Sequence, residues 1–351
     1  MNFRKKGRTY LYAVAALAAA GALTACGSAG NGISSAMELI RGLDYQGALE
    51  ELAAAEEKGE NGRLVERARG IAYMGLTDYE SAVEAFLSAL EMSDGRIEDV
   101  DFDLNYYLAA AYTKNGQYSE AEAVYSAVLA LRPGEEDAYF LRGNARMHLG
   151  SYDAALEDFD KAVSMAPGNY DRLIEIYQVL DYYGCKSQGQ EYLQAALASG
   201  EKQMDKYDSG RIYYYLGEYQ NAYLALEAAK EEGGAESCLY LGRAYEATGD
   251  YNYAANVYQS YLGKNQGTAQ MYNQLGLCQM QRGDYQGALE AFQAGLALED
   301  GSFLQTLSFN EIAAYEYLED YQQAFALLET YLKNYPDDDT ARREYDFLST
   351  R

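Results

Sequence analysis

A short alanine-centred pattern recurs nine times along this chain and constrains its fold more than any other feature. Its central residue, the anchor, is alanine in eight copies and glycine in one, and it recurs about every 34 residues. The nine anchors are Ala48, Ala82, Ala121, Ala155, Gly189, Ala222, Ala254, Ala288 and Ala324. A fixed period of this length is typical of repeat proteins, in which each unit packs against its neighbours. We therefore expect the chain to bind partners rather than to catalyse a reaction.

Glycines and prolines mark the ends of two helices in each unit. Six units have glycine five residues before the anchor, where a helix end turns through positive φ. These are Gly116, Gly150, Gly184, Gly217, Gly249 and Gly283. The three prolines, Pro133, Pro167 and Pro336, each stand twelve residues after an anchor, where a second helix should stop. The pattern predicts a helix, a tight turn and a second helix, with the anchor near the start of the second helix.

Side-chain size changes in a regular way around the predicted turn. The residue twelve before the anchor is alanine or glycine in seven units, and the residue four after it is large and apolar in all nine. In the fourth unit these residues are Gly143 and Phe159. A glycine inside a helix costs about 1 kcal/mol relative to alanine, so its recurrence implies a close approach of two helices. We expect the small residue at the crossing and the large side chain beside it.

The fourth unit shows the complete order of residues that the other units share in part. Small, alanine, aromatic, alanine and proline residues follow one another at Gly143, Ala155, Phe159, Ala162 and Pro167. This order resembles the tetratricopeptide repeat family. The resemblance covers residues 34–336 and implies an all-α fold, a right-handed α-solenoid of about nine helix-turn-helix units that holds protein or peptide ligands along its concave side. Residues 337–351 interleave charged and apolar side chains, which fits a C-terminal capping helix.

The fifth unit departs from the pattern. Its anchor is Gly189, and its crossing position holds Tyr177, which is too large for a tight helix crossing. Glycine also lowers the helix propensity of the second helix. We interpret this unit as a weaker joint that can flex.

The first 25 residues differ from the rest of the chain and predict a lipoprotein signal peptide. Four basic residues precede an uncharged apolar run over residues 10–25. The run ends in Leu-Thr-Ala-Cys-Gly at residues 23–27, which resembles the bacterial lipobox. The resemblance implies cleavage before Cys26 and attachment of a lipid to its sulfur, with palmitate as the expected acyl chain. Residues 26–33 would then form a short tether, and the chain would lie on the extracytoplasmic side of the bacterial cell membrane.

An uncleaved membrane helix is the alternative interpretation of this leader. The apolar run is shorter than the ~20 residues that a bilayer-spanning helix needs, and small residues crowd its end. Both interpretations place the repeats outside the membrane and close to it.

The chain is strongly acidic, with a formal net charge of −26. Removal of the four basic residues of the leader would take it to −30. This charge disfavours nucleic acid and anionic lipid head groups as partners and favours basic or neutral peptides. Alternatively, the acidic residues simply form solvated helix faces.

The residue types needed for common catalytic and metal sites are scarce. His148 is the only histidine, so histidine-based triads and multi-histidine metal sites are excluded. Cys238 and Cys278 lie among apolar neighbours and are interpreted as core residues, whereas Cys185 follows a glycine turn and could be exposed. We find no phosphate-binding or nucleotide-binding motif, and we expect no cofactor, no metal and no enzymatic activity.

Three alternating aspartates, Asp99, Asp101 and Asp103, resemble the start of a calcium loop. The glycine and the closing glutamate of such a loop are replaced by Leu104 and Ala110. Acidic residues that favour the start of a helix are the simpler interpretation.

A candidate partner-binding stripe follows from counting back fifteen and eleven residues from each anchor. These positions lie four apart on the first helix of each unit, beside the packing stripe, and should face the concave side. The candidate residues are Tyr106, Phe140, Asn144, Tyr207, Arg211, Arg243, Asn273 and Phe309. Aromatic, amide and arginine side chains suit an extended or helical peptide, and Arg211 and Arg243 could hold an acidic group. Alternatively, some of the aromatic residues pack against the next unit.

Together, these features predict a lipid-anchored, non-enzymatic scaffold or adaptor at the bacterial cell surface, with protein or peptide partners in the cell envelope. The alternative is a surface lipoprotein that binds cell-wall glycans, since stacked tyrosines can also bind sugars.

Overall fold

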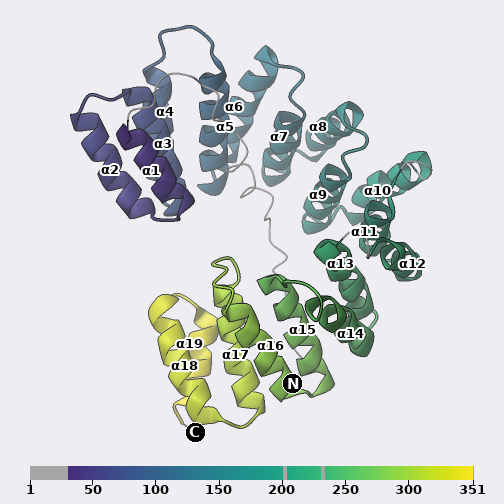
Figure 1. Cartoon of the computed structure of the whole chain (residues 1–351). Coiled ribbons are helices and arrows are strands. Elements are labelled where there is room, and N and C mark those ends of the chain that lie inside the picture. Colours follow the sequence, from purple (N-terminus) through teal and green to yellow (C-terminus); the bar gives the residue numbers. More distant parts are fainter. Residues whose placement is uncertain (1–30, 201–203, 231–233, 351) are drawn as a thin grey trace. The chain divides into compact units, whose positions relative to one another are not determined.

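Every regular element in the described part of the chain is an α-helix. The computed structural model describes residues 31–200, 204–230 and 234–350 (Figure 1). The helices are α1 (Asn31–Arg41), α2 (Tyr45–Glu57), α3 (Gly62–Gly75), α4 (Tyr79–Glu91), α5 (Asp99–Lys114), α6 (Tyr118–Leu131), α7 (Glu136–His148), α8 (Tyr152–Met165), α9 (Tyr170–Tyr182), α10 (Lys186–Gly200), α11 (Lys206–Leu216), α12 (Tyr219–Ala229), α13 (Gly234–Ala247), α14 (Tyr251–Leu262), α15 (Ala269–Arg282), α16 (Tyr285–Leu296), α17 (Leu304–Tyr317), α18 (Tyr321–Asn334) and α19 (Asp339–Leu348). The expected all-α fold is confirmed.

The helices form nine consecutive pairs, from α1 and α2 to α17 and α18, followed by α19, which packs against α18. Each anchor is the fourth residue of the second helix of its pair. The chain divides into two compact units, residues 1–189 and residues 190–351. From α1 to α9, and again from α11 to α19, successive helices pack against one another in chain order, as an α-solenoid of helix pairs requires (Figure 1).

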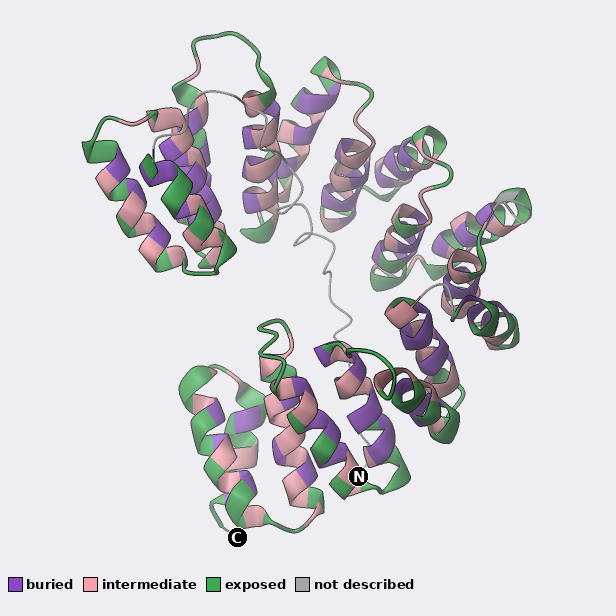
Figure 2. Cartoon of the chain, viewed as in Figure 1, coloured by how far each residue is buried: buried purple, intermediate pink, exposed green. Residues whose placement is uncertain are grey.

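The small and large residues of the repeat meet at the crossing in the seven pairs that have a small residue there. All nine anchors and all nine large residues four positions after them are buried. Buried residues recur along the helices of both compact units (Figure 2). The glycines at the crossing are necessary because a Cβ atom at Gly276 would lie 2.4 Å from Cε1 of Phe292, and one at Gly143 would lie 2.6 Å from Cε1 of Phe159. The predicted packing is confirmed.

In the fifth pair the large residue lies on the first helix and the smallest residue lies on the second. The ring of Tyr177 occupies the crossing, and a Cβ atom at Gly189 would lie 3.1 Å from Cα of Tyr177. The large residue on one helix is therefore matched by the glycine on the other. The division between the two compact units falls at Gly189, and flexibility of this joint stays a prediction.

The turn between the helices of each pair uses positive φ in all nine units. The six predicted glycines have φ between 72° and 83°. Leu43, Thr77 and Glu319 occupy the same position in the remaining units and also have positive φ, at 63°, 59° and 61°. The conformation is therefore imposed by the repeat, because it occurs even where the residue carries a Cβ atom.

Replacing Thr77 by glycine is expected to raise the free energy of unfolding by about 1 kcal/mol. A β-branched residue in the left-handed region is strained, and glycine adopts this region freely. Chemical denaturation monitored by circular dichroism measures the change. Thr113→Gly is the control, since Thr113 lies inside α5 and glycine there should be destabilising. A loss of stability in Thr77→Gly would contradict the explanation.

The ends of the chain differ in part from the expected boundaries. Helix α1 begins at Asn31 and buries Ile33, so the tether expected over residues 26–33 overlaps the first helix. The overlap arises because Gly32 and Ile33 donate backbone hydrogen bonds to the carboxylate of Glu60, at 3.0 and 3.1 Å. Residues 1–25, predicted to be a signal peptide, and Cys26, the predicted lipidation site, lie outside the described residues.

Candidate partner-binding surface

The first helices of the pairs carry the candidate stripe. In the first compact unit these include α3, α5, α7 and α9, and in the second they include α11, α13, α15 and α17. Four of the eight candidate residues are buried, namely Phe140, Asn144, Arg211 and Asn273. The other four, Tyr106, Tyr207, Arg243 and Phe309, are half-buried. Burial leaves these four residues little area for a ligand, and the role of the stripe in partner binding stays a prediction.

The next unit covers Phe140. The guanidinium carbon of Arg172, on α9, lies 4.0 Å from the centroid of the Phe140 ring, and the ring of Phe159 lies 6.0 Å away. Only 4% of Phe140 remains exposed. This residue stabilises the junction between the fourth and fifth units and has little area left for a ligand.

The two buried polar candidates Asn273 and Arg211 also serve the packing of neighbouring helices. The Asn310 side-chain amide, on α17, donates a hydrogen bond of 2.8 Å to Oδ1 of Asn273. Arg211 pairs with Asp208 on its own helix and lies over the ring of Tyr207, 4.4 Å from its centroid. These contacts explain their burial, since a buried polar group is costly unless it is hydrogen-bonded.

Tyr106 and Phe309 keep part of their surface exposed. The Tyr106 hydroxyl donates a hydrogen bond of 3.5 Å to Glu135, and burial together with the nearby Glu135 carboxylate raises its pKa. The phenol is therefore neutral at neutral pH, and its single O–H is directed at Glu135. Phe309 lies 5.5 Å from the ring of Tyr331, between centroids.

Arginines join the first helices of adjacent units in the first compact unit. Arg63 and Arg67, on α3, pair with Asp101 and Asp103 on α5, and Arg132 pairs with Asp99. The three aspartates that resemble a calcium loop are thus engaged by three arginines from neighbouring helices. Sequence analysis missed these pairs because their members lie more than 30 residues apart.

A second arginine network lies inside the fourth unit. Asp158 accepts hydrogen bonds from Nε and Nη2 of Arg142, at 2.9 and 2.6 Å, and from Nη1 of Arg146, at 2.9 Å. The hydrogen bonds that Arg142 donates to Asp158 raise the pKa of Arg142. Because the carboxylate is almost fully buried, the network belongs to the fold rather than to a binding surface.

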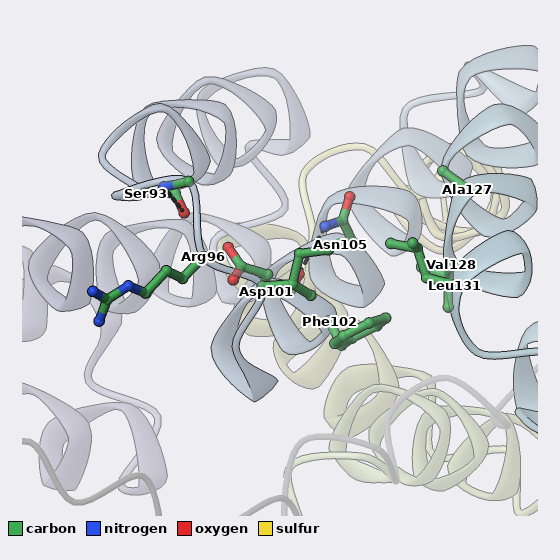
Figure 3. A pocket seen from close by; sticks show the side chains of 10 residues that line it. Ser93, Arg96, Asp101, Phe102, Asn105, Ala127, Val128 and Leu131 are labelled. Carbon is green, nitrogen blue, oxygen red and sulfur yellow. Dashed lines mark hydrogen bonds between the residues drawn. The ribbon is translucent and has the colours of Figure 1, made fainter.

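A pocket of about 280 Å³ lies beside the segment that joins α4 to α5. Phe102 on α5 faces Val128 and Leu131 on α6 across it (Figure 3). Its polar residues already have partners, since the Asn105 amide donates to the backbone of Asp101 and the Asp101 carboxylate pairs with Arg63. The pocket is small and mostly apolar and offers little to orient a ligand.

The thiols and the single histidine are packing residues. Cys238 and Cys278 are 6% and 1% exposed, and burial raises the pKa of both thiols, so they are not activated nucleophiles. The prediction that Cys238 and Cys278 are core residues is confirmed. Cys185 is half-buried. His148 stacks on Tyr118, with 3.9 Å between ring centroids, and burial lowers its pKa.

The described residues contain neither a metal-ligand cluster nor a membrane-spanning helix. No group of three or more histidine, cysteine, aspartate or glutamate side chains there is arranged to hold a metal ion. In the same part of the chain, no helix has both the length and the hydropathy to cross a bilayer.

Comparison with known families identifies the repeat. A model of the tetratricopeptide repeat matches residues 67–136, 108–170 and 239–302, and a second model of that repeat matches residues 312–338. The chain is built of tetratricopeptide repeats. The matches fall on helix pairs already delimited by the anchors, in both compact units. Proteins of this family are generally non-enzymatic interaction scaffolds, and tetratricopeptide repeats generally bind protein partners.

Individual relatives are distant. A tetratricopeptide repeat-containing protein of Methanocaldococcus jannaschii is 23% identical over 267 residues, which are 66% of this chain and 43% of the relative. A protein of Dictyostelium discoideum described as a DnaJ homolog subfamily C member 7 homolog is 24% identical over 205 residues, 58% of this chain and 36% of the relative. The chain spans less than half the length of these curated relatives.

Solved structures of such repeats are similar to parts of the chain. A tetratricopeptide repeat protein from Parabacteroides merdae aligns over 70% of this chain and 97% of its own, with 14% identity and a TM-score of 0.45. The protein MamA from Desulfovibrio magneticus aligns over 50% of this chain and 99% of its own, with 22% identity and a TM-score of 0.42.

Proposed function

We propose that this tetratricopeptide-repeat chain is a lipid-anchored, non-enzymatic scaffold that binds protein or peptide partners of the bacterial cell envelope. The observation that carries the binding role is the set of half-buried side chains on the first helices, Tyr106, Tyr207, Arg243 and Phe309. Rigid aromatic side chains and arginine are enriched at the energetic centres of protein interfaces. Tyr207 and Arg243 lie on successive repeats of the second compact unit, which suits an extended ligand that contacts more than one repeat.

The membrane anchor is supported by the leader sequence. A basic segment, an apolar run and the Leu-Thr-Ala-Cys-Gly sequence at residues 23–27 stand in the order of a lipoprotein signal. A diacyl lipid on Cys26 would hold the repeats at the extracytoplasmic membrane surface, because two acyl chains give stable anchoring.

In-cell photocrosslinking of the full chain tests this proposal. A photoreactive phenylalanine analogue at Tyr207 is expected to crosslink envelope proteins or peptides that mass spectrometry identifies. The matched control is the same analogue at Tyr152, which lies on the second helix α8 and is 46% exposed. Cys26→Ser should move the chain out of the membrane fraction and remove membrane-dependent crosslinks, whereas Cys185→Ser should not. Equal crosslinking from both tyrosine positions would contradict partner binding by the first helices. Membrane retention of Cys26→Ser would contradict the lipid anchor.

Glycan binding is the second candidate, and it is favoured by an aromatic stack whose outer member, Tyr253, is exposed. Tyr223, Tyr245 and Tyr253 stack in sequence, with centroid distances of 4.4 and 5.4 Å. If this stack binds sugar, the full chain should sediment with purified peptidoglycan and Tyr253→Ala should weaken the sedimentation. Photocrosslinks at Tyr207 would then be absent.

A further inference from the structure

Six side chains from two successive first helices form a tyrosine–arginine cluster in the second compact unit. Helix α11 contributes Tyr207, Arg211, Tyr214 and Tyr215, and α13 contributes Tyr240 and Arg243. The two helices pack directly against each other. The cluster therefore combines positions from two adjacent repeats.

Tyr240 is the centre of the cluster. Its ring centroid lies 6.1, 5.8 and 6.1 Å from those of Tyr207, Tyr214 and Tyr215, in edge-to-face arrangements. The hydroxyls of Tyr215 and Tyr240 are 3.3 Å apart and hydrogen-bonded. Interlocked aromatic rings of this kind form a rigid surface, because each ring restricts the rotamers of its neighbours.

Both arginines reach the central ring. The guanidinium carbons of Arg211 and Arg243 lie 5.9 and 5.5 Å from the centroid of Tyr240. Arg211 is engaged by Asp208, whereas none of the described carboxylates lies within ion-pair distance of Arg243. Cation–π attraction to the rings holds the Arg243 guanidinium in place without using its N–H donors.

Arg243 is exceptional among the arginines of this acidic chain. Eleven of the other arginines in the described residues form ion pairs, from Arg41 to Arg342. The remaining two in that part of the chain, Arg282 and Arg343, are exposed to solvent. Arg243 is the one that is half-buried and lacks an acidic partner among the described residues.

The Glu246 carboxylate acts electrostatically on Arg243 but forms no ion pair with it. The Glu246 carboxylate attracts Arg243 only at longer range, because it accepts hydrogen bonds from the Tyr258 hydroxyl at 2.6 Å and from the Gln274 amide at 3.1 Å. A partly desolvated guanidinium without a counter-charge costs free energy. A ligand that supplies the charge would recover this cost.

We propose that the tyrosine–arginine cluster binds a carboxylate of an acidic peptide segment, with Arg243 as the residue that pairs with it. The planar guanidinium matches a carboxylate in a bidentate geometry. Tyrosine hydroxyls can donate further hydrogen bonds, and the rings provide apolar area for neighbouring residues of the peptide. This inference rests on the proposed partner-binding function and adds that the ligand is acidic. The net charge of the chain by itself would favour a basic or neutral ligand.

Selection from a library of short random peptides tests the inference with the purified full chain. The chain is expected to enrich peptides rich in aspartate or glutamate, or peptides that depend on a free C-terminal carboxylate. Each enriched peptide is resynthesised with its C-terminus amidated, and separately with Asp and Glu replaced by Asn and Gln, to distinguish the two sources of the carboxylate. Arg243→Gln should weaken binding of the carboxylate form by about tenfold or more, as expected for loss of a charged hydrogen-bonded pair.

Arg282→Gln is the matched control, because it removes the same charge from an exposed position on α15. Arg243→Lys keeps the charge and the stem and should weaken binding less than Arg243→Gln; it also provides a folded variant if the glutamine variant unfolds. Equal losses in Arg243→Gln and Arg282→Gln, or unchanged binding in both Arg243 variants, would overturn the inference. Enrichment of peptides without any carboxylate dependence would overturn it and leave the binding function intact, whereas no enrichment at all would count against both.

Discussion

Replacing Phe292 by alanine is expected to lower the free energy of unfolding by about 4 kcal/mol, because it empties the helix crossing of the eighth unit. The ring is fully buried and fills the space left by Gly276 on the facing helix. Chemical denaturation measures the loss. Phe347→Ala is the control, since Phe347 is 42% exposed on α19 and its removal should cost less than about 1 kcal/mol.

The pair Gly276 and Phe292 also predicts a strong coupling. Gly276→Ala alone should be destabilising by about 2 kcal/mol, because the new Cβ atom would lie 2.4 Å from the Phe292 ring. In the Phe292→Ala background the same change should be neutral or stabilising, since the ring is gone and alanine favours the helix. Additive effects in this double-mutant cycle would show that the Phe292 ring is not the reason why residue 276 has to be glycine.

Replacing Asp158 by alanine is expected to lower the free energy of unfolding by about 3 kcal/mol. The carboxylate is 3% exposed and accepts hydrogen bonds from both Arg142 and Arg146, so its removal leaves two partly buried arginines with less compensation. Thermal and chemical unfolding of the full chain measure the effect.

Asp153 provides the control for Asp158. It is exposed near the start of the same helix, so Asp153→Ala should change stability by about 0.5 kcal/mol or less. If Asp158→Ala were as mild as Asp153→Ala, the network would not be a stabilising part of the fourth unit. Replacing Asp158 together with both arginines by apolar residues should recover much of the loss, because no buried charge then remains.

The regular features of the fold could be predicted from sequence because they depend on residues close together in the chain. The glycine at position 283 and its equivalents require only the local backbone conformation of a helix end. The prolines Pro133, Pro167 and Pro336 each stand two residues after the end of a helix, at Leu131, Met165 and Asn334. The same logic missed Leu43, Thr77 and Glu319, which adopt the glycine conformation without being glycine.

The binding surface could be predicted only in outline. Counting from the anchors placed the candidate residues on the first helices, but it could not tell Phe140, which Arg172 covers, from Tyr106, which keeps exposed area. The covering residue lies 32 positions further along the chain, and nothing in the pattern of the fourth unit indicates it. Likewise, Arg211 and Arg243 appear equivalent in the sequence, yet Arg211 is engaged by Asp208 and Arg243 is not.

The sequence by itself determined the number of helix pairs, the glycine turns of six units and the match of small to large residues at seven crossings, because each is set by contacts within one unit and recurs along the chain. Only the tertiary structure decided which stripe residues stay accessible and which arginine remains without an acidic partner in the described residues. Those outcomes depend on contacts between adjacent units, and the side chains that make them vary from one unit to the next.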